Sequence, residues 1–351
     1  MMRVLIGALV VFAACDEPGG RGGAVDIEVG DGDLGAEITD PDVTSPDVTP
    51  DEVAAETSPE TVVPPQCIDD LYDEVLPNDR ADLSGLLASY SEADYLTFAN
   101  AVLDARYPFG AFLVREANAG GAGGLGNCIT AFARNRDSAS DLIGDLSTVV
   151  HECGHIYDLD RGGFASDYYQ IADGVVFECS RGDTNDGRGG DTFARSRLNG
   201  DNFAPAYPDD FYRDVYLDGN PDDGSFDSGD QGFNSVLEEA TQYINSLATD
   251  WALRDQLRFS ISARDGLLTF LWYIERYLHM ARNQFPSAYA RISGDVCWRQ
   301  AILTVWGRGW FYLDLTADIQ QLGIDDDTIE RLVLTPELLN EIDLLRQLEC
   351  P

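Results

Sequence analysis

The apolar residues of this 351-residue chain recur mainly at intervals of three and four, the spacing that places them on one face of a helix. Alternation of apolar and polar residues, which is typical of half-buried strands, is rare. The helices that this pattern predicts cover residues 68–76, 83–90, 91–103, 138–163, 233–247, 265–282, 296–315, 327–334 and 336–348. Strands are predicted over 127–134 and 175–179. The sequence therefore predicts an α+β fold that is predominantly helical.

The start of the chain resembles a bacterial lipoprotein signal. Arg3 makes the first residues positive, and the apolar run 4–14 that follows is too short to span a bilayer. The residues that end at Cys15 resemble a lipobox, although Phe12 stands where leucine is preferred. We therefore expect residues 1–14 to be removed and Cys15 to carry the lipid that anchors an exported protein to the membrane. A plain secretory signal is the alternative.

Residues 15–66 are rich in Asp, Glu, Thr, Pro and Gly and contain no aromatic residue. Such a segment cannot bury enough apolar surface to fold, and its like charges extend it. We expect a disordered tether that holds the folded domain, predicted over 67–351, away from the membrane. The domain would then lie in the periplasm or at the cell surface.

The formal net charge of the chain is −39, and all of its basic residues are arginines. A surface this acidic repels nucleic acids and anionic membranes. Nucleic acid is therefore excluded as an expected partner, and the membrane contact is expected only through the lipid anchor.

The six cysteines that follow Cys15 are an even number, which suits disulfides in an oxidising compartment. Cys67 and Cys350 bracket the folded part and are expected to pair, because chain termini tend to lie close together. Cys153 is expected to point into the core, which suits a bridge or a buried thiol and argues against a metal ligand. The pairing of the remaining cysteines stays open.

His151, Glu152 and His155 form a His-Glu-x-x-His motif in the helix predicted over 138–163. Helical residues four apart lie within about 40° of each other, so both imidazoles can bind one metal ion. Glu152 lies about 100° round the helix from His151 and falls beside them. This is the arrangement of a zinc site in which the glutamate acts on a zinc-activated water and does not bind the metal.

Zinc needs a third protein ligand if one coordination position is to stay open for water. The helix predicted over 233–247 carries two adjacent candidates, Glu238 and Glu239. Thr148, the uncharged residues at 149, 153, 154 and 156, and Tyr157 also fit the extended zincin motif over 148–157. Together with this extended motif, the helix makes the chain resemble the gluzincins, the thermolysin-like branch of the zincin metallopeptidases. The resemblance implies a zincin-like catalytic domain with Glu239 as the third ligand, and Glu238 stays open as the alternative. Tyr243 stands where thermolysin has an acid that orients a histidine.

The resemblance also implies a mechanism. Zinc held by His151, His155 and Glu239 activates a water, and Glu152 accepts its proton as the water attacks a peptide carbonyl. In such enzymes a histidine after the ligand helix stabilises the oxyanion, so His279 is a candidate for that role. The alternative for His279 is a hydrogen-bonded or exposed helix histidine. Further candidates for the same role are Tyr157, Tyr168, Tyr169 and Tyr273.

Two acidic loops, 183–187 and 218–230, have the oxygen density to hold structural calcium, although neither has the EF-hand register. Plain solvated loops are the alternative.

These observations favour an exported zinc peptidase of the bacterial cell envelope, which acts on protein or peptide substrates as a monomer. The alternative is a non-catalytic surface-binding or structural lipoprotein that zinc only stabilises. A metal-dependent hydrolase of a non-peptide bond is the third hypothesis.

Overall fold

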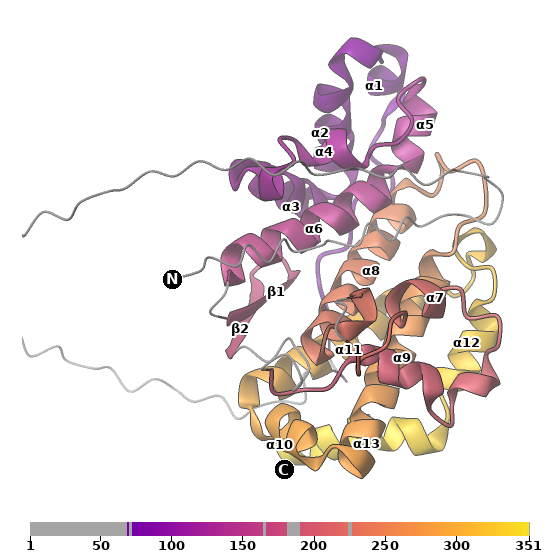
Figure 1. Cartoon of the computed structure of the whole chain (residues 1–351). Helices are drawn as coiled ribbons and strands as arrows, with labels where there is room; N and C mark the ends of the chain where they lie inside the picture. Colours follow the sequence, from indigo (N-terminus) through magenta and orange to yellow (C-terminus); the bar gives the residue numbers. More distant parts are fainter. Residues whose placement is uncertain (1–68, 70–71, 164–165, 181–189, 224–226, 351) are drawn as a thin grey trace, which may run out of the picture. The chain divides into compact units, whose positions relative to one another are not determined.

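The computed structural model describes residues 69, 72–163, 166–180, 190–223 and 227–350, and it is predominantly helical, as expected (Figure 1). The helices are α1 (Ser84–Ala88), α2 (Tyr95–Arg106), α3 (Pro108–Ala119), α4 (Cys128–Phe132), α5 (Ala139–Gly144), α6 (Leu146–Gly162), α7 (Arg213–Tyr216), α8 (Phe233–Leu253), α9 (Ala263–Gln284), α10 (Pro286–Gly294), α11 (Val296–Leu315), α12 (Asp326–Val333) and α13 (Pro336–Glu349). Short 3-10 helices include η4 (Arg195–Gly200) and η7 (Gln320–Leu322). Within these residues, the sheet is one antiparallel hairpin of β1 (Ser166–Ala172) and β2 (Val175–Ser180).

The long predicted helices are confirmed at nearly their predicted positions. The helices expected over 233–247, 265–282, 296–315, 327–334 and 336–348 are α8, α9, α11, α12 and α13. The strand expected over 175–179 is β2. The sequence spacing succeeded here because these elements bury a continuous apolar face in one core.

The strand predicted over 127–134 is wrong, because this segment contains the short helix α4. Asn127 begins it as an N-cap: its side-chain oxygen accepts a hydrogen bond from the Thr130 amide at 3.0 Å. The helix predicted over 138–163 is two helices, α5 and α6, which meet at Asp145. The Asp145 carboxylate accepts a hydrogen bond from the Asn135 amide at 2.8 Å, which ties this break to the preceding loop.

The helix predicted over 68–76 is also wrong in its described part, because residues 72–76 are irregular. Glu74 turns instead toward α11, where it pairs with the fully buried Arg308 at 2.8 Å and accepts a hydrogen bond from Tyr312. A buried guanidinium without a counter-charge is strongly unfavourable. The tertiary ion pair therefore outweighs the helical spacing of this short segment.

Helix α6 lies in the interior, in contact with α3, α8 and β1. Its residues from Val149 to Asp158 are buried. Toward α3 the contact is apolar and aromatic, with the rings of Phe112 and Tyr157 5.5 Å apart. Toward α8 it is polar, because α8 buries amide, hydroxyl and carboxylate side chains there. The helix that carries the motif is thus enclosed on several sides.

Two disulfides join elements around this helix. Cys128 of α4 bonds to Cys153 of α6, and Cys179 of β2 bonds to Cys297 of α11. Cys153 therefore forms a disulfide, which is one of the two roles expected for it. Cys67, the expected partner of Cys350, lies outside the described residues.

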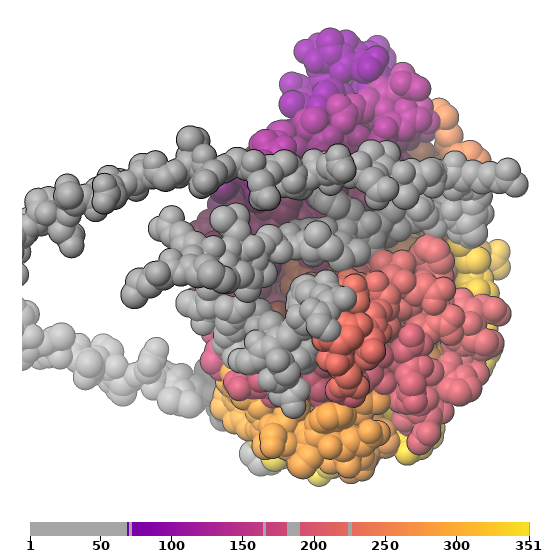
Figure 2. Space-filling model, in the orientation of Figure 1, coloured from indigo at the N-terminus to yellow at the C-terminus, as the bar shows by residue number. Residues whose placement is uncertain are grey.

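None of the helices in the described ranges is long and apolar enough to cross a membrane. The expected signal peptide, the expected lipidation site at Cys15 and the expected tether all lie outside those ranges. On the face shown in Figure 2, the surface is formed partly by the segment 190–223, in salmon, and partly by α10, in orange. The segment 190–223 consists mainly of turns and short helices.

Glu275 of α9 is a buried carboxyl group whose oxygens make no hydrogen bonds with the described residues. It is 0% exposed. Burial, together with the negative Glu341, raises the pKa of Glu275 well above its usual value. The folded state therefore binds this proton more tightly than the unfolded state, so the free energy of unfolding falls as the pH rises above the usual carboxyl range.

We expect Glu275→Met to raise the free energy of unfolding by about 1–3 kcal/mol, because it removes an unsatisfied buried carboxyl group. The gain should be larger at pH 8 than at pH 5, and urea unfolding at both values measures it. Glu92→Met, at an exposed position, is the control and should change little. A Glu275→Met protein that is less stable than the wild type at pH 8 would contradict this account.

Candidate metal centre

Both histidines of the motif project from one side of α6, as their spacing predicted. His151 is 2% exposed and His155 is 8% exposed, and their ring centroids lie 4.6 Å apart. The two Nε2 atoms approach each other to 2.9 Å. The pair is therefore arranged to share a single ligand.

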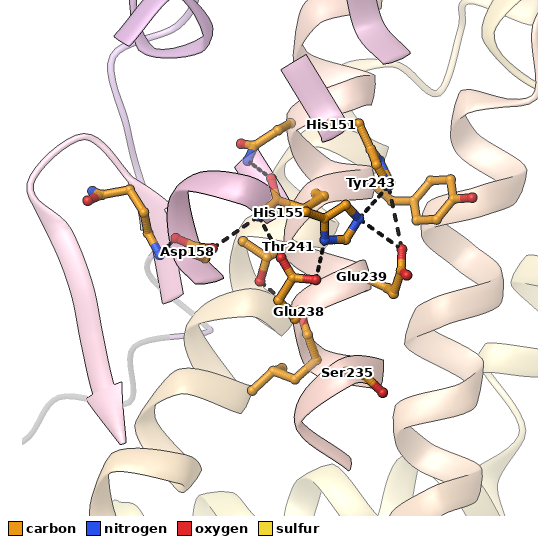
Figure 3. A network of polar contacts seen from close by, with 12 residues as sticks. His151, His155, Asp158, Ser235, Glu238, Glu239, Thr241 and Tyr243 are labelled. Carbon is orange, nitrogen blue, oxygen red and sulfur yellow. Dashed lines mark hydrogen bonds and ion pairs between the residues drawn. The ribbon is translucent and has the colours of Figure 1, made fainter. Parts of the chain in front are cut away.

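Helix α8 brings Glu239 to the same point (Figure 3). Its Oε2 atom lies 3.5 Å from the Nε2 of His151 and 3.3 Å from the Nε2 of His155. His151, His155 and Glu239 together form a group that could hold a metal ion, with ligand atoms all within 4.8 Å of one another. The predicted set of three ligand residues is thus brought together from two helices far apart in the sequence.

The donor atoms fit one small metal ion. Zinc bonds of about 2.1 Å in a tetrahedron place neighbouring ligand atoms about 3.4 Å apart. The two distances to Glu239 match this value, and the distance between the imidazoles is somewhat shorter. The Oε2 atom of Glu239 is buried and makes no hydrogen bond of good geometry with a described residue. A cation at this point would satisfy that oxygen.

The Nδ1 atom of each imidazole, on the side away from the shared point, contacts a side chain of α8. His151 Nδ1 lies 3.1 Å from the Ser246 hydroxyl, and His155 Nδ1 forms a short hydrogen bond with Glu238 Oε2. An imidazole that donates from Nδ1 presents the lone pair of Nε2 to a metal. Glu238 therefore orients His155, while Glu239 faces the shared point, which separates the roles of the two adjacent glutamates.

Tyr243 contributes an aromatic contact to the site. Its ring packs edge-on against His151, with centroids 4.7 Å apart, and its hydroxyl lies 2.9 Å from the Tyr216 hydroxyl. The orienting partner of His151 is instead Ser246, one turn further along α8. The sequence could not reveal the role of Ser246, because it depends on the rotation of α8 against α6.

Glu152 lies beside the histidines and binds neither of them. It is 5% exposed, and its Oε2 atom has no hydrogen-bond partner among the described residues. Burial raises the pKa of Glu152 above its usual value, although the positive charges of His151 and His155 oppose this effect. A carboxyl group with a raised pKa is well suited to accept and return a proton near neutral pH.

Without a metal, the charges of this cluster favour a proton on His155. Burial lowers the pKa of His155, but Glu238 and Glu239 outweigh it and raise that pKa well above the usual value. Conversely, burial raises the pKa of Glu239, but the two histidines outweigh it and lower that pKa. A metal that binds to Nε2 must therefore displace a proton, so binding should weaken as the pH falls.

Two further polar residues of the site were missed from the sequence. Gln242 is fully buried, and its amide nitrogen donates to Glu238 Oε1 at 3.2 Å and to Asp158 Oδ2 at 3.1 Å. Arg195, 1% exposed, donates to the Ser235 hydroxyl at 3.3 Å, one turn before Glu239 on α8. Each is isolated in its local sequence and acquires a role only through contacts between elements.

His279 is not brought to this group. It lies on α9, where its Nδ1 is 3.1 Å from Glu341 and its Nε2 is 3.6 Å from Glu337, both on α13. The Asn283 amide nitrogen lies 3.1 Å from the Nε2 of His279, and the Phe203 ring packs edge-on against the imidazole. His279 therefore has the contacts of a hydrogen-bonded helix histidine, the alternative stated for it, and its role toward an oxyanion gains no support from the described residues.

Calcium is not supported by the described acids. Across the described ranges, the His151–His155–Glu239 group is the only set of three metal-binding residue types that lie close enough together. The loop 183–187 lies outside the described residues, and the loop 218–230 is described except for 224–226.

Comparison with protein-family models, curated proteins and solved structures finds no match for this chain.

The close approach of α8 to the motif depends on Gly154. A Cβ atom at this position would lie 1.9 Å from the Gln242 side-chain oxygen. We expect Gly154→Ala to lower the free energy of unfolding by about 1–3 kcal/mol through overpacking, and to weaken metal binding because α6 and α8 must move apart. Urea unfolding and a metal titration measure the two effects.

Gly85→Ala in α1 is the matched control, because a Cβ atom there would meet nothing within 4 Å. It should leave metal binding unchanged. Equal behaviour of the two alanine variants would show that Gly154 is not a packing constraint.

Proposed function

We propose that this protein is a zinc-dependent peptidase with His151, His155 and Glu239 as metal ligands and Glu152 as general base. One observation carries the proposal: two histidines of α6 and a glutamate of α8 converge at one point. Beside them lies a second glutamate, Glu152, whose buried Oε2 has no hydrogen-bond partner among the described residues. A purely structural metal site does not need that second carboxylate.

The donor set favours zinc. Two imidazole nitrogens and one carboxylate oxygen are the ligands of many catalytic zinc sites, whereas calcium and magnesium prefer oxygen alone. Bound zinc would supply Lewis-acid activation of a water and polarisation of a substrate carbonyl. Three protein ligands also leave one tetrahedral position for those groups.

Glu152 performs the proton transfers in this proposal. Its carboxylate accepts a proton from the attacking water and passes it to the amine that leaves when the peptide bond breaks. Burial raises the pKa of Glu152, and a raised pKa favours uptake of the proton before the group passes it on. Ser246 and Glu238 keep the two imidazoles in place throughout.

The proposed setting is the bacterial cell envelope. The two disulfides support an oxidising compartment, since such bonds are rare in the cytosol. In this setting the lipid on Cys15 anchors the protein, and the segment 15–66 gives the peptidase reach toward protein or peptide substrates. A secreted form without the lipid is the second setting.

Glu152→Gln tests the general base. We expect zinc content to stay at the wild-type level, because Glu152 is not a ligand, while hydrolysis falls by about 10²–10⁴-fold. Cleavage of an unstructured protein, with and without a zinc chelator, measures activity, and metal analysis measures zinc. Glu337→Gln, at an exposed position on α13, is the control. Wild-type protein that binds zinc but shows no chelator-sensitive cleavage would favour the non-catalytic alternative.

Glu239→Ala tests the third ligand. Zinc affinity should fall more in this variant than in Glu238→Ala, because Glu239 faces the metal point and Glu238 only orients His155. For Glu238→Ala the loss should be about 10–100-fold, the usual effect of removing a group that orients a ligand. Competition with a chromophoric chelator gives both affinities, and the reverse order would assign the ligand to Glu238.

A further inference from the structure

Two adjacent glutamates on α8 lie close enough to the imidazoles to bind them, yet only one faces the shared point. Glu239 Oε2 lies within 3.5 Å of both Nε2 atoms, whereas Glu238 binds the opposite side of His155, at Nδ1. A flexible carboxylate so close to a cation would compete for it. Something must therefore hold Glu238 away.

Both oxygens of Glu238 are occupied (Figure 3). Oε2 takes the hydrogen bond from His155, and Oε1 accepts one from the Gln242 amide nitrogen at 3.2 Å. Gln242 lies four residues after Glu238, one helical turn along the same face of α8. The Gln242 amide is thus the group that fixes the carboxylate from the side away from the imidazole.

Gln242 itself cannot rotate freely. Its amide nitrogen also donates to Asp158 at 3.1 Å, and its oxygen accepts from the Asn245 amide at 2.9 Å. Asn245 in turn accepts from Arg308 at 2.7 Å, which reaches α11. The side chain is fully buried against Gly154, where an added Cβ atom would lie 1.9 Å from the Gln242 oxygen. Its orientation is therefore determined by α6, α8 and α11 together.

We propose that Gln242 is a positioning residue that assigns the roles of the two glutamates: it holds Glu238 as the partner of His155, so that Glu239 is the only carboxylate ligand. This inference rests on the metal site of the proposed function. Loss of the Gln242 amide leaves Glu238 Oε1 buried without its donor, and the carboxylate turns from His155 toward the cation.

Gln242→Met tests the inference, since methionine has a similar length and cannot donate a hydrogen bond. We expect zinc to bind about 10–100-fold more weakly, as measured by competition with a chromophoric chelator. The visible spectrum of the cobalt-substituted protein should also change, because a different set of oxygens surrounds the ion. Gln321→Met is the matched control: Gln321 donates two side-chain hydrogen bonds to backbone oxygens on another part of the chain, and its loss should leave both readouts unchanged.

A double-mutant cycle with Glu238→Ala identifies the route of the effect. If Gln242 acts through Glu238, Gln242→Met should weaken zinc binding little further once Glu238 is alanine. Additive losses, or a Gln242→Met protein with the wild-type affinity and cobalt spectrum, would overturn the inference. Should Gln242→Met fail to fold, Gln242→Asn keeps an amide that is too short to reach Glu238 and Asp158 together, and the same outcomes apply to it.

These readouts measure metal binding and not hydrolysis. Failure of the peptidase proposal alone therefore does not affect them. A wild-type protein that binds no zinc at all would overturn both the proposed function and the role of Gln242.

Discussion

Polar side chains are buried between two helices at little cost only if each finds a partner, and the contact between α6 and α8 is governed by that requirement. The imidazoles of α6 need partners for Nδ1, which Ser246 and Glu238 of α8 supply. Asp158 of α6 needs donors, and Gln242 of α8 is one of them. Sliding one helix along the other would leave several of these groups unpaired at once. The register of the two helices is therefore fixed, and with it the approach of Glu239 to the histidines.

The parts of this arrangement that could be predicted are those that depend on one helix at a time. His151 and His155 must share a face because they are four residues apart, and the structure confirms it. Glu239 was expected on a downstream helix, but only the rotation of α8 distinguishes it from Glu238. Gln242 could not be predicted at all, since its contacts with α6 bridge more than eighty residues of sequence. The helix predicted over 68–76 was wrong for the same reason. The conformation of residues 72–76 is set by the ion pair between Glu74 and the buried Arg308, and not by the spacing of their apolar residues.

In this strongly acidic chain, the site differs from the rest of the protein because its carboxyl groups are buried close together. In a protein of net charge −39, most carboxylates can remain hydrated, but four acids are gathered around the two histidines. They avoid mutual repulsion in different ways: burial and the nearby Glu238 raise the pKa of Asp158, which accepts hydrogen bonds from the Gln170 and Gln242 amides. Glu238 is held by hydrogen bonds from His155 and Gln242. Glu239 and Glu152 each retain a buried oxygen that makes no hydrogen bond with a described residue, and these are the two acids with proposed roles toward metal and water.

The two variable positions of the motif are as constrained as its fixed ones. Cys153 points away from the imidazoles and bonds to Cys128, which fastens α4 to the back of α6. Gly154, the next residue, has no side chain and so allows Gln242 of α8 to lie directly against the helix backbone. Successive residues of a helix point about 100° apart, so these three residues contact different neighbours. Glu152 lies beside the histidines, Cys153 bonds to Cys128, and Gly154 lies against Gln242. A general His-Glu-x-x-His pattern allows any residue at its two middle positions. In this fold, Cys153 anchors α6 through its disulfide, and Gly154 leaves room for the close approach of α8. The local sequence is therefore determined by packing on both sides of the helix as well as by the chemistry on its ligand face.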